Sequence, residues 1–279
     1  MTGEQSTRRR FLASSLALAG SCVAGCLNQG TAGGGLGSPS VISETPISGR
    51  NLAVTLADDH EVSKLNLIGP DGSAFKSTAV QAGATQVEIE LFSLRRGWHY
   101  TPGKHELVAI RDEEEIASKK IKLEPDLTIV DVSQYLGGED DPQNRANVVV
   151  TVENRGTAPT WVYYLAFDET PRATQDPRDG HPTTSPLQAL ELPRTKRETV
   201  IASGDSQKFL SKWPPFRFTG EQHCRDMTID FTLTIYTGIG DNKSQRCRAT
   251  LSGERIQELH KETCSDISIE MLGGSDTDA

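Results

Sequence analysis

The stretch Asn147-Val-Val-Val-Thr-Val-Glu153 contains the clearest strand pattern of the sequence. It is followed by the turn Asn154-Arg155-Gly156 and by a second apolar stretch from Thr160 to Phe167. Successive side chains of a strand point to opposite faces, so alternate residues share one face. The spacing predicts a buried row in each strand, namely Val148, Val150 and Val152 in the first and Trp161, Tyr163, Leu165 and Phe167 in the second.

The two-residue spacing of the first strand continues as Val-x-Val-x-Val-x-Asn-x-Gly-x-Ala, from Val148 to Ala158. This arrangement resembles the CARDB-type β-sandwich modules of bacterial and archaeal surface proteins. The resemblance is close over the strand pair and loose over residues 127–272. It implies a β-sandwich fold and a role at a cell surface, and it implies no activity.

The same alternation extends outward from this pair, between turn signals such as Gly69-Pro70-Asp71-Gly72. Short alternating strands bounded by Gly, Pro and Asp are typical of antiparallel sandwiches. Glu124-Pro125-Asp126 indicates a domain boundary. We therefore expect an all-β fold with two tandem immunoglobulin-like β-sandwich domains, residues 47–125 and 126–272. The apolar residues that alternate in the first domain are Leu52, Val54, Leu56, Leu65, Leu67, Val87, Ile89, Leu91, Leu107, Ala109, Ile121 and Leu123.

Two parts of the second domain depart from this pattern. Asp168 to Glu198 is interrupted by prolines, which prevent a long ladder, and we interpret it as a long Pro-rich insertion. Near the C-terminus, Ser252 is expected to cap one short helix that ends near Lys261, with Ile256 and Leu259 facing inward.

Three cysteines lie in the expected folded body, Cys224, Cys247 and Cys264. A hairpin centred near residues 240–241 would place Cys247 opposite Thr234, too far from Cys224 for a disulfide. The predicted pair is therefore Cys224–Cys264, at two strand starts that can meet at one end of a sandwich, with Cys247 as the odd thiol. A Cys247–Cys264 pair stays open, because the expected helix can return the chain beside its own strand.

The N-terminus contains two predicted targeting signals. Arg8 and Arg9, followed by Phe11 and Leu12 and a short apolar run, resemble a twin-arginine export signal. Val23-Ala24-Gly25-Cys26 resembles a lipobox, in which the cysteine is lipidated and becomes the mature N-terminus. This implies a signal peptide over residues 1–25, a lipid on Cys26 and a location at the outer face of the cell membrane. Cys22 is the weaker lipidation candidate.

Charge and composition restrict the possible partners of the chain. The net charge is −9 with 38 acidic and 29 basic residues, and removal of residues 1–25 would bring it to −11. This balance argues against nucleic acid as a partner. An acidic, lysine-poor chain with these targeting signals resembles exported lipoproteins of halophilic archaea (haloarchaea), and an ordinary acidic protein is the alternative. Residues 26–46, rich in Gly and Ser, are expected to be a flexible linker, and 273–279 a disordered tail.

The sequence contains none of the common catalytic motifs, such as His-Glu-x-x-His, Gly-x-Ser-x-Gly, a phosphate loop or Cys-x-x-Cys. We expect no catalytic site, cofactor site or metal site. Asp58-Asp59-His60-Glu61 and Glu139-Asp140-Asp141 are oxygen-rich enough for Ca²⁺, but both lack the glycine and spacing of a calcium loop, so solvated turns are the preferred interpretation.

Two further features bear on function. Trp213-Pro-Pro-Phe216-Arg-Phe218 is either an exposed recognition surface or a filling for one end of the sandwich. Asn242-Lys243-Ser244 is a glycosylation sequon at a predicted hairpin tip, which makes Asn242 a candidate acceptor. The hypothesis is a lipid-anchored surface module that binds a protein or glycan partner. The alternative is a ligand-capture lipoprotein that serves a transporter or surface enzyme complex.

Overall fold

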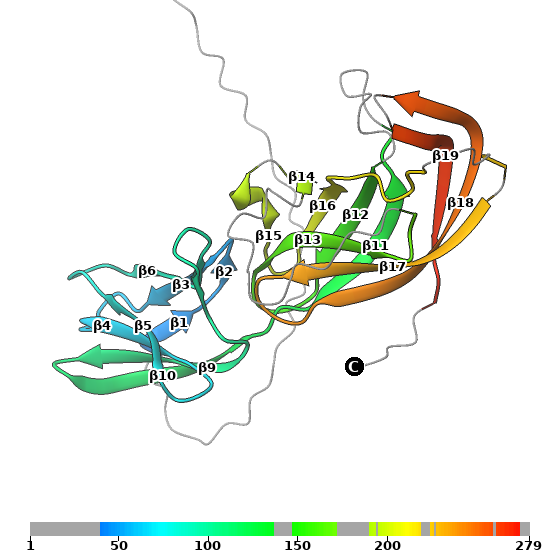
Figure 1. The fold of residues 1–279 in the computed structure, drawn as a ribbon. Helices are drawn as coiled ribbons and strands as arrows, with labels where there is room; N and C mark the ends of the chain where they lie inside the picture. The colour runs from blue at the N-terminus through cyan, green and yellow to red at the C-terminus, as the bar shows by residue number, and fades with distance from the viewer. Residues whose placement is uncertain are drawn as a thin grey trace, which may run out of the picture. The chain divides into compact units, whose positions relative to one another are not determined.

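The computed structural model describes residues 40–136, 147–171, 190–193, 195–218, 224–225, 227–258 and 261–273. These residues fall within one compact unit, 39–279. Apart from the short 3₁₀ turn η3 (Lys196–Thr199), every regular element among them is a β-strand, so the fold is all-β as predicted (Figure 1). No helix in the described part of the chain is long and apolar enough to span a membrane.

The first sandwich contains two four-stranded sheets and a two-stranded ribbon. In one sheet β3 pairs with β1, β2 and β6, and the other has the order β10-β9-β4-β5. The ribbon is β7-β8. The strands are β1 (Ile42–Glu44), β2 (Ile47–Ser48), β3 (Asn51–Leu56), β4 (Lys64–Ile68), β5 (Ala74–Ala79), β6 (Gln86–Glu90), β7 (Phe92–Ser93), β8 (Trp98–His99), β9 (Gly103–Arg111) and β10 (Glu114–Leu123).

The core of this sandwich follows the predicted alternation. Strand β3 has an alternating burial pattern that buries Leu52, Val54 and Leu56, and β4 buries Leu65 and Leu67. The predicted linker, residues 26–46, extends too far, because β1 already begins at Ile42. Ile42 pairs with Leu56 and is only 2% exposed, so the apolar side chain of this short strand belongs to the core.

The second sandwich has a sheet with the order β11-β12-β16-β14 and a five-stranded sheet with the order β15-β13-β17-β18-β19 (Figure 1). The predicted row Val148, Val150 and Val152 is fully buried in β12. The strands are β11 (Leu127–Gln134), β12 (Val148–Asn154), β13 (Thr160–Asp168), β14 (Leu190–Leu192), β15 (Val200–Ile201), β16 (Ser206–Ser211), β17 (Met227–Thr237), β18 (Lys243–Glu258) and β19 (Lys261–Met271).

The predicted buried row of β13 is only half right. Leu165 and Phe167 belong to the core of the second sandwich, but the pairing with β17 shifts between Val162 and Tyr164. An extra residue in one strand reverses the faces on either side of it. Val162 therefore takes the core position, and Trp161 packs against the core of the first sandwich instead.

The C-terminal prediction is also wrong in two respects. The expected helix after Ser252 is strand, because β18 continues to Glu258 and pairs with β19, with Ile256 opposite Thr263. The register shifts between Ser252 and Arg255, where Gly253 has a φ of 79°, and this irregularity imitates helical spacing in the sequence. In the β17–β18 hairpin Cys247 faces Phe231, three residues from the predicted partner Thr234.

The two sandwiches are joined through residues of the Asn-x-Gly-x-Ala segment. The buried Asn154 amide donates to the carbonyls of Ala158 (2.8 Å) and Ile201 (3.1 Å) and accepts from the backbone of Asp126 (3.1 Å) and Gly156 (3.0 Å). A Cβ on Gly156 would lie 2.3 Å from the Asp126 nitrogen, so only glycine fits beside the connecting segment.

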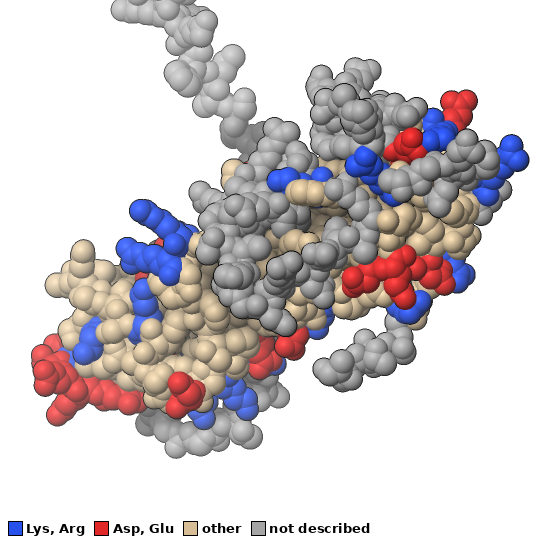
Figure 2. Space-filling view, viewed as in Figure 1, with Lys and Arg blue, Asp and Glu red and all other residues tan. Residues whose placement is uncertain are grey.

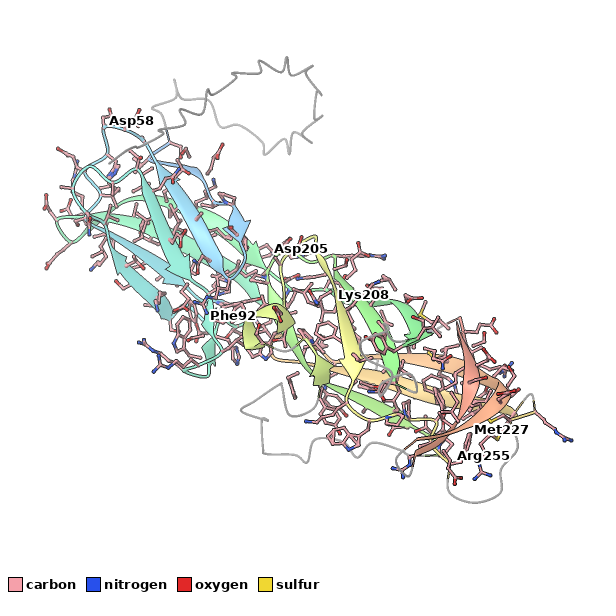
Figure 3. All side chains as sticks on the ribbon, turned by 90° about the horizontal axis from the view of Figure 1, so that it is seen from above. Asp58, Phe92, Asp205, Lys208, Met227 and Arg255 are labelled. Atoms are coloured by element: carbon pink, nitrogen blue, oxygen red, sulfur yellow. A yellow bond between two sulfur atoms is a disulfide. The ribbon has the colours of Figure 1, made fainter. Side chains whose placement is uncertain are left out.

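Aromatic rings complete this junction. The Trp161 ring lies 5.0 Å from that of Phe92, which Figure 3 labels where the two sandwiches meet. The Tyr100 hydroxyl donates to the carbonyl of Pro159 over 2.8 Å. The junction is therefore both apolar and hydrogen-bonded.

Candidate functional site

Several sequence predictions lie outside the described residues. They concern the export signal with Arg8, Arg9, Phe11 and Leu12, the lipidation site Cys26, the acidic stretch 139–141, the tail beyond 273 and most of the Pro-rich insertion. All of them stay predictions.

Cys224 and Cys264 form a disulfide with a Cα–Cα distance of 5.5 Å, and this is the pair that the sequence predicts. Cys264 lies inside β19, however, and not before a strand as predicted. Cys247 is the free thiol, and burial raises its pKa to about 11. A buried thiol with a raised pKa is a poor nucleophile at neutral pH.

Asn242 lies in the turn between β17 and β18 and is exposed, as the hairpin prediction requires. Its Oδ1 accepts from the Thr237 backbone over 3.1 Å, which orders the turn. Glycosylation of Asn242 stays a prediction.

The acidic stretch at residues 58–61 is a structured turn. His60 Nδ1 accepts from the Val62 backbone over 3.0 Å, its Nε2 lies 2.9 Å from the Ala84 carbonyl oxygen, and Glu61 pairs with Arg111. In the described part of the chain no three His, Cys, Asp or Glu side chains are grouped to hold a metal ion.

The Trp213–Phe218 segment is divided between the two interpretations. Phe216 and Phe218 are buried in the core of the second sandwich, whereas Trp213 is 36% exposed. The Nζ of Lys212 lies 5.0 Å from the centroid of the Trp213 ring system.

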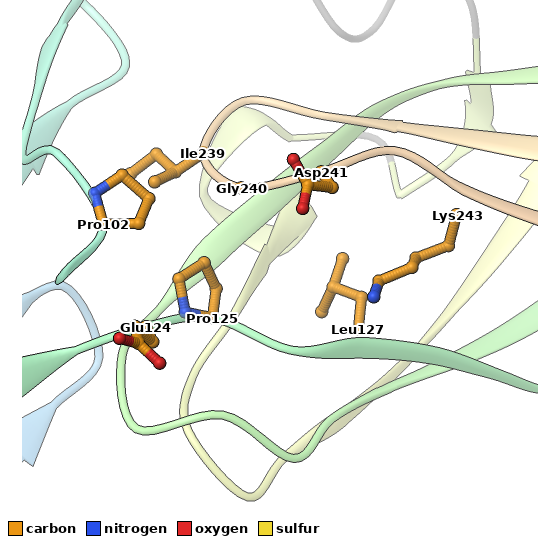
Figure 4. A pocket seen from close by; sticks show the side chains of 8 residues that line it. All are labelled: Pro102, Glu124, Pro125, Leu127, Ile239, Gly240, Asp241 and Lys243. Carbon is orange, nitrogen blue, oxygen red and sulfur yellow. The ribbon is translucent and has the colours of Figure 1, made fainter. Parts of the chain in front are cut away.

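A pocket of about 290 Å³ lies at the junction, lined by Pro102, Glu124, Pro125, Leu127, Ile239, Gly240, Asp241 and Lys243. Figure 4 shows apolar side chains around it, with the Lys243 ammonium directed towards Leu127. The Lys243 Nζ pairs with Asp126 Oδ1 over 3.4 Å, so its charge is already partly neutralised.

A second candidate is the tip of the β7–β8 hairpin. The turn over residues 94–97 is closed by a hydrogen bond from the Gly97 nitrogen to the Ser93 carbonyl over 2.9 Å. Arg95 and Arg96 are exposed in this turn, and neither forms an ion pair with a residue that the structure describes. Trp98 follows in β8 and is half-buried.

Strand β5 contributes the other half of this candidate site. The Phe75 ring meets Trp98 edge to face at 6.0 Å, and the Lys76 Nζ lies 4.2 Å from the centre of the Trp98 ring system. Neighbouring strand residues normally point to opposite faces. Here the pairing with β4 shifts, because Leu67 faces Lys76 while Ile68 faces Ala74, and Phe75 is the extra residue. The bulge turns Phe75 and Lys76 to the same indole ring.

Buried rings support this arrangement from behind. Phe75 packs against His105 at 6.5 Å, and His105 packs against Tyr100 at 6.2 Å. His105 is 2% exposed, and its Nε2 has no hydrogen-bond partner in the described part of the chain. Burial lowers the pKa of His105, opposed by the Gly103 carbonyl and the Asp71 charge. The imidazole is therefore held neutral as part of the core.

We call Lys76, Arg95, Arg96 and Trp98 the cationic hairpin surface. Figure 2 shows Lys and Arg side chains gathered on one part of the surface of the first sandwich. Acidic side chains gather at the other end of the sandwich, around the β9–β10 turn with its residues Asp112, Glu113 and Glu114 (Figure 2).

This surface is not among the sites that the sequence predicts. A signal was present, because Leu94-Arg95-Arg96-Gly97-Trp98-His99 combines paired cations with an aromatic residue at a glycine turn. Phe75 and Lys76 could not be added, since a bulge that brings two neighbours to one ring leaves no distinct pattern in the sequence.

Comparison with known proteins gives distant likenesses only. No known protein family matches the sequence, and no curated protein matches it. A β-glucuronidase from glycoside hydrolase family 2 is 10% identical with a TM-score of 0.23, over 80% of this chain and 20% of that chain. A two-domain fibronectin type-III segment from chicken tenascin is 11% identical with a TM-score of 0.22, over 84% of this chain and 96% of that one. This chain thus spans about a fifth of the glycosidase.

Proposed function

We propose that this chain is a lipid-anchored extracytoplasmic β-sandwich protein that acts as a binding module at the outer face of the cell membrane and not as an enzyme. The observation that carries the proposal is the cationic hairpin surface, in which the exposed Arg95 and Arg96 lie in the turn before Trp98 and the Lys76 ammonium lies against the Trp98 ring, which Phe75 holds at its edge. Rigid aromatic and arginine side chains are the typical anchors of recognition surfaces.

The proposed location rests on two independent features. The N-terminal sequence from Arg8 to Cys26 resembles an export signal with a lipobox. The Cys224–Cys264 disulfide supports the same compartment, because such bonds persist outside the reducing cytoplasm.

Localisation of the full chain tests this proposal. Cys26→Ser is expected to release the exported body from membranes, since a lipid with two chains anchors firmly and the unmodified body has no such anchor. Lys in place of both Arg8 and Arg9 is expected to block export. Cys22→Ser serves as the control and should leave membrane attachment unchanged. Full membrane retention of Cys26→Ser, or export of the double Lys variant at the normal level, would contradict the proposal.

A second candidate function is ligand capture for a transporter or surface enzyme complex. The pocket of about 290 Å³ at the junction favours it, because this volume is at the lower end of the range for small-molecule sites. Leu127→Trp would fill this pocket, and loss of binding to a transporter or enzyme complex in this variant but not in Arg95→Ala/Arg96→Ala would favour this second candidate.

A further inference from the structure

We infer that the cationic hairpin surface binds an anionic polysaccharide, with Trp98 against a sugar ring and Arg95, Arg96 and Lys76 against its carboxylates or sulfates. This inference rests on the proposed function as a surface binding module and names its partner. Four side chains from two separate segments carry it, the bulged strand β5 and the β7–β8 hairpin.

The charge of the surface is the first argument. The whole chain is acidic, with a net charge of −9, yet Arg95 and Arg96 stand together with no carboxylate partner among the described residues. At physiological salt, charges further away than about 8 Å are largely screened, so a ligand at the hairpin responds mainly to these local cations. Exposed arginines bind carboxylate and sulfate oxygens through paired N–H donors.

The supported aromatic ring is the second argument. Trp98 is held by Phe75 at its edge, and Phe75 in turn rests on the buried His105 and thus on Tyr100. A ring fixed in this way loses little conformational freedom when a ligand binds. The Lys76 ammonium lies 4.2 Å from the indole centre. The ring therefore holds this cation in place before an anionic group of the ligand binds to it.

The combination of one aromatic ring with three cations favours one class of polyanion over the others. Nucleic acids need a more extended basic surface than three cations on an acidic protein provide. Binding to an anionic membrane surface is the competing possibility, and the vesicles in the test below distinguish it from binding to a polysaccharide. A polysaccharide with one anionic group for each sugar or two fits a surface that pairs one half-buried ring with a small group of cations.

The test is affinity electrophoresis of the full chain in gels that contain polygalacturonate, dextran sulfate or neutral dextran, followed by titration with fluorescently labelled polymer. We expect retardation by one or both acidic polymers and none by dextran. Arg95→Ala/Arg96→Ala is expected to weaken binding about tenfold or more, because each lost charge-assisted contact alone approaches that factor. Trp98→Ala should weaken it as well.

Matched control variants test whether the effect depends on the position of the substituted residues and not only on the change in charge or aromatic content. Lys104→Ala/Lys120→Ala removes two exposed cations elsewhere on the first sandwich and so makes the same change in net charge. Trp213→Ala removes an exposed indole that also has an adjacent lysine, Lys212. Both controls should bind like the wild type, and equal thermal unfolding midpoints show that all variants are folded.

Several outcomes would overturn the inference. They are no binding of either acidic polymer by the wild type, equal weakening by the control pair, binding of a single-stranded oligonucleotide as tight as that of the polysaccharides, or equally tight binding of phosphatidylglycerol vesicles by the unlipidated Cys26→Ser form. Membrane attachment of the same variants through Cys26 is measured in parallel. If the wild type attaches to membranes but binds neither acidic polymer, the polysaccharide is contradicted and the anchored location still stands.

Discussion

At the scale of single residues, Asn154 shows how one side chain connects two sandwiches. Its amide is completely buried and makes hydrogen bonds with four backbone groups, from Asp126, Gly156, Ala158 and Ile201. The resemblance to surface modules placed an Asn at this position, but its role follows only from the structure. The amide substitutes for backbone pairing where β12 ends and the connecting segment passes.

Asn154→Ala is expected to destabilise the protein by about 3 kcal/mol or more, because it leaves buried donors and acceptors without partners. Asn154→Asp should be similarly harmful, since a carboxylate cannot donate to the carbonyls of Ala158 and Ile201. Chemical denaturation measures both changes. Asn51→Ala, which removes an exposed amide bonded to Glu88, should cost much less, and an equal cost would contradict this role for Asn154.

His105 makes stability depend on pH. Burial lowers its pKa in the folded state below the ordinary value of 6.5. Above about pH 6.5 both the folded and the unfolded state carry a neutral imidazole, and below it the unfolded state takes up the proton first. The free energy of unfolding should therefore fall as the pH falls from about 6.5 towards 5, before most carboxylates titrate.

His105→Leu tests this dependence, because Leu continues the core row of Leu107 and Ala109. The variant should show a flatter profile of unfolding free energy over that pH range. An unchanged slope in His105→Leu would show that another group is responsible.

At the scale of elements, β-bulges separate what the sequence could predict from what it could not. Alternation located the strands around Leu52, Leu65 and Val148, because each buries one face without interruption. The bulges of β5, β13 and β18 add a residue and reverse the faces beyond it. For that reason the predicted buried row of β13 holds for Leu165 and Phe167 but not for Trp161, and the sequence after Ser252 imitates a helix. The bulge of β5 likewise hides the contribution of this strand to the candidate site.

The outer edge of β19 carries a further element-level prediction. The Gln134 side chain donates to the Ser265 carbonyl over 3.1 Å and accepts from the Ile267 nitrogen over 2.9 Å, so an amide from β11 occupies this edge. Gln134→Ala should cost about 1–3 kcal/mol and speed hydrogen exchange at Ile267, because buried or paired backbone groups lose their partner. Gln207→Ala, on an exposed amide of β16, should leave exchange at Ile267 unchanged.

At the scale of the whole molecule, the disulfide adds stability to the second sandwich. It closes a span of 40 residues. In the chain-entropy model, such a loop contributes about 4 kcal/mol. Cys224→Ser/Cys264→Ser should lower the free energy of unfolding by an amount of this order, while Cys247→Ser should not change the disulfide content. Peptide mapping without reductant checks the pairing, and a fragment that joins Cys247 to either partner would contradict the structure.

The burial of Cys247 has a consequence for the order of folding and oxidation. If oxidation comes first, three thiols compete on a flexible chain, and wrong bridges need an isomerase to undo them. If folding comes first, Cys247 is enclosed in the sheet and Cys224, which is only partly buried, already lies beside Cys264. Oxidation of the folded protein then gives only the Cys224–Cys264 disulfide, and no isomerase is needed to correct the pairing.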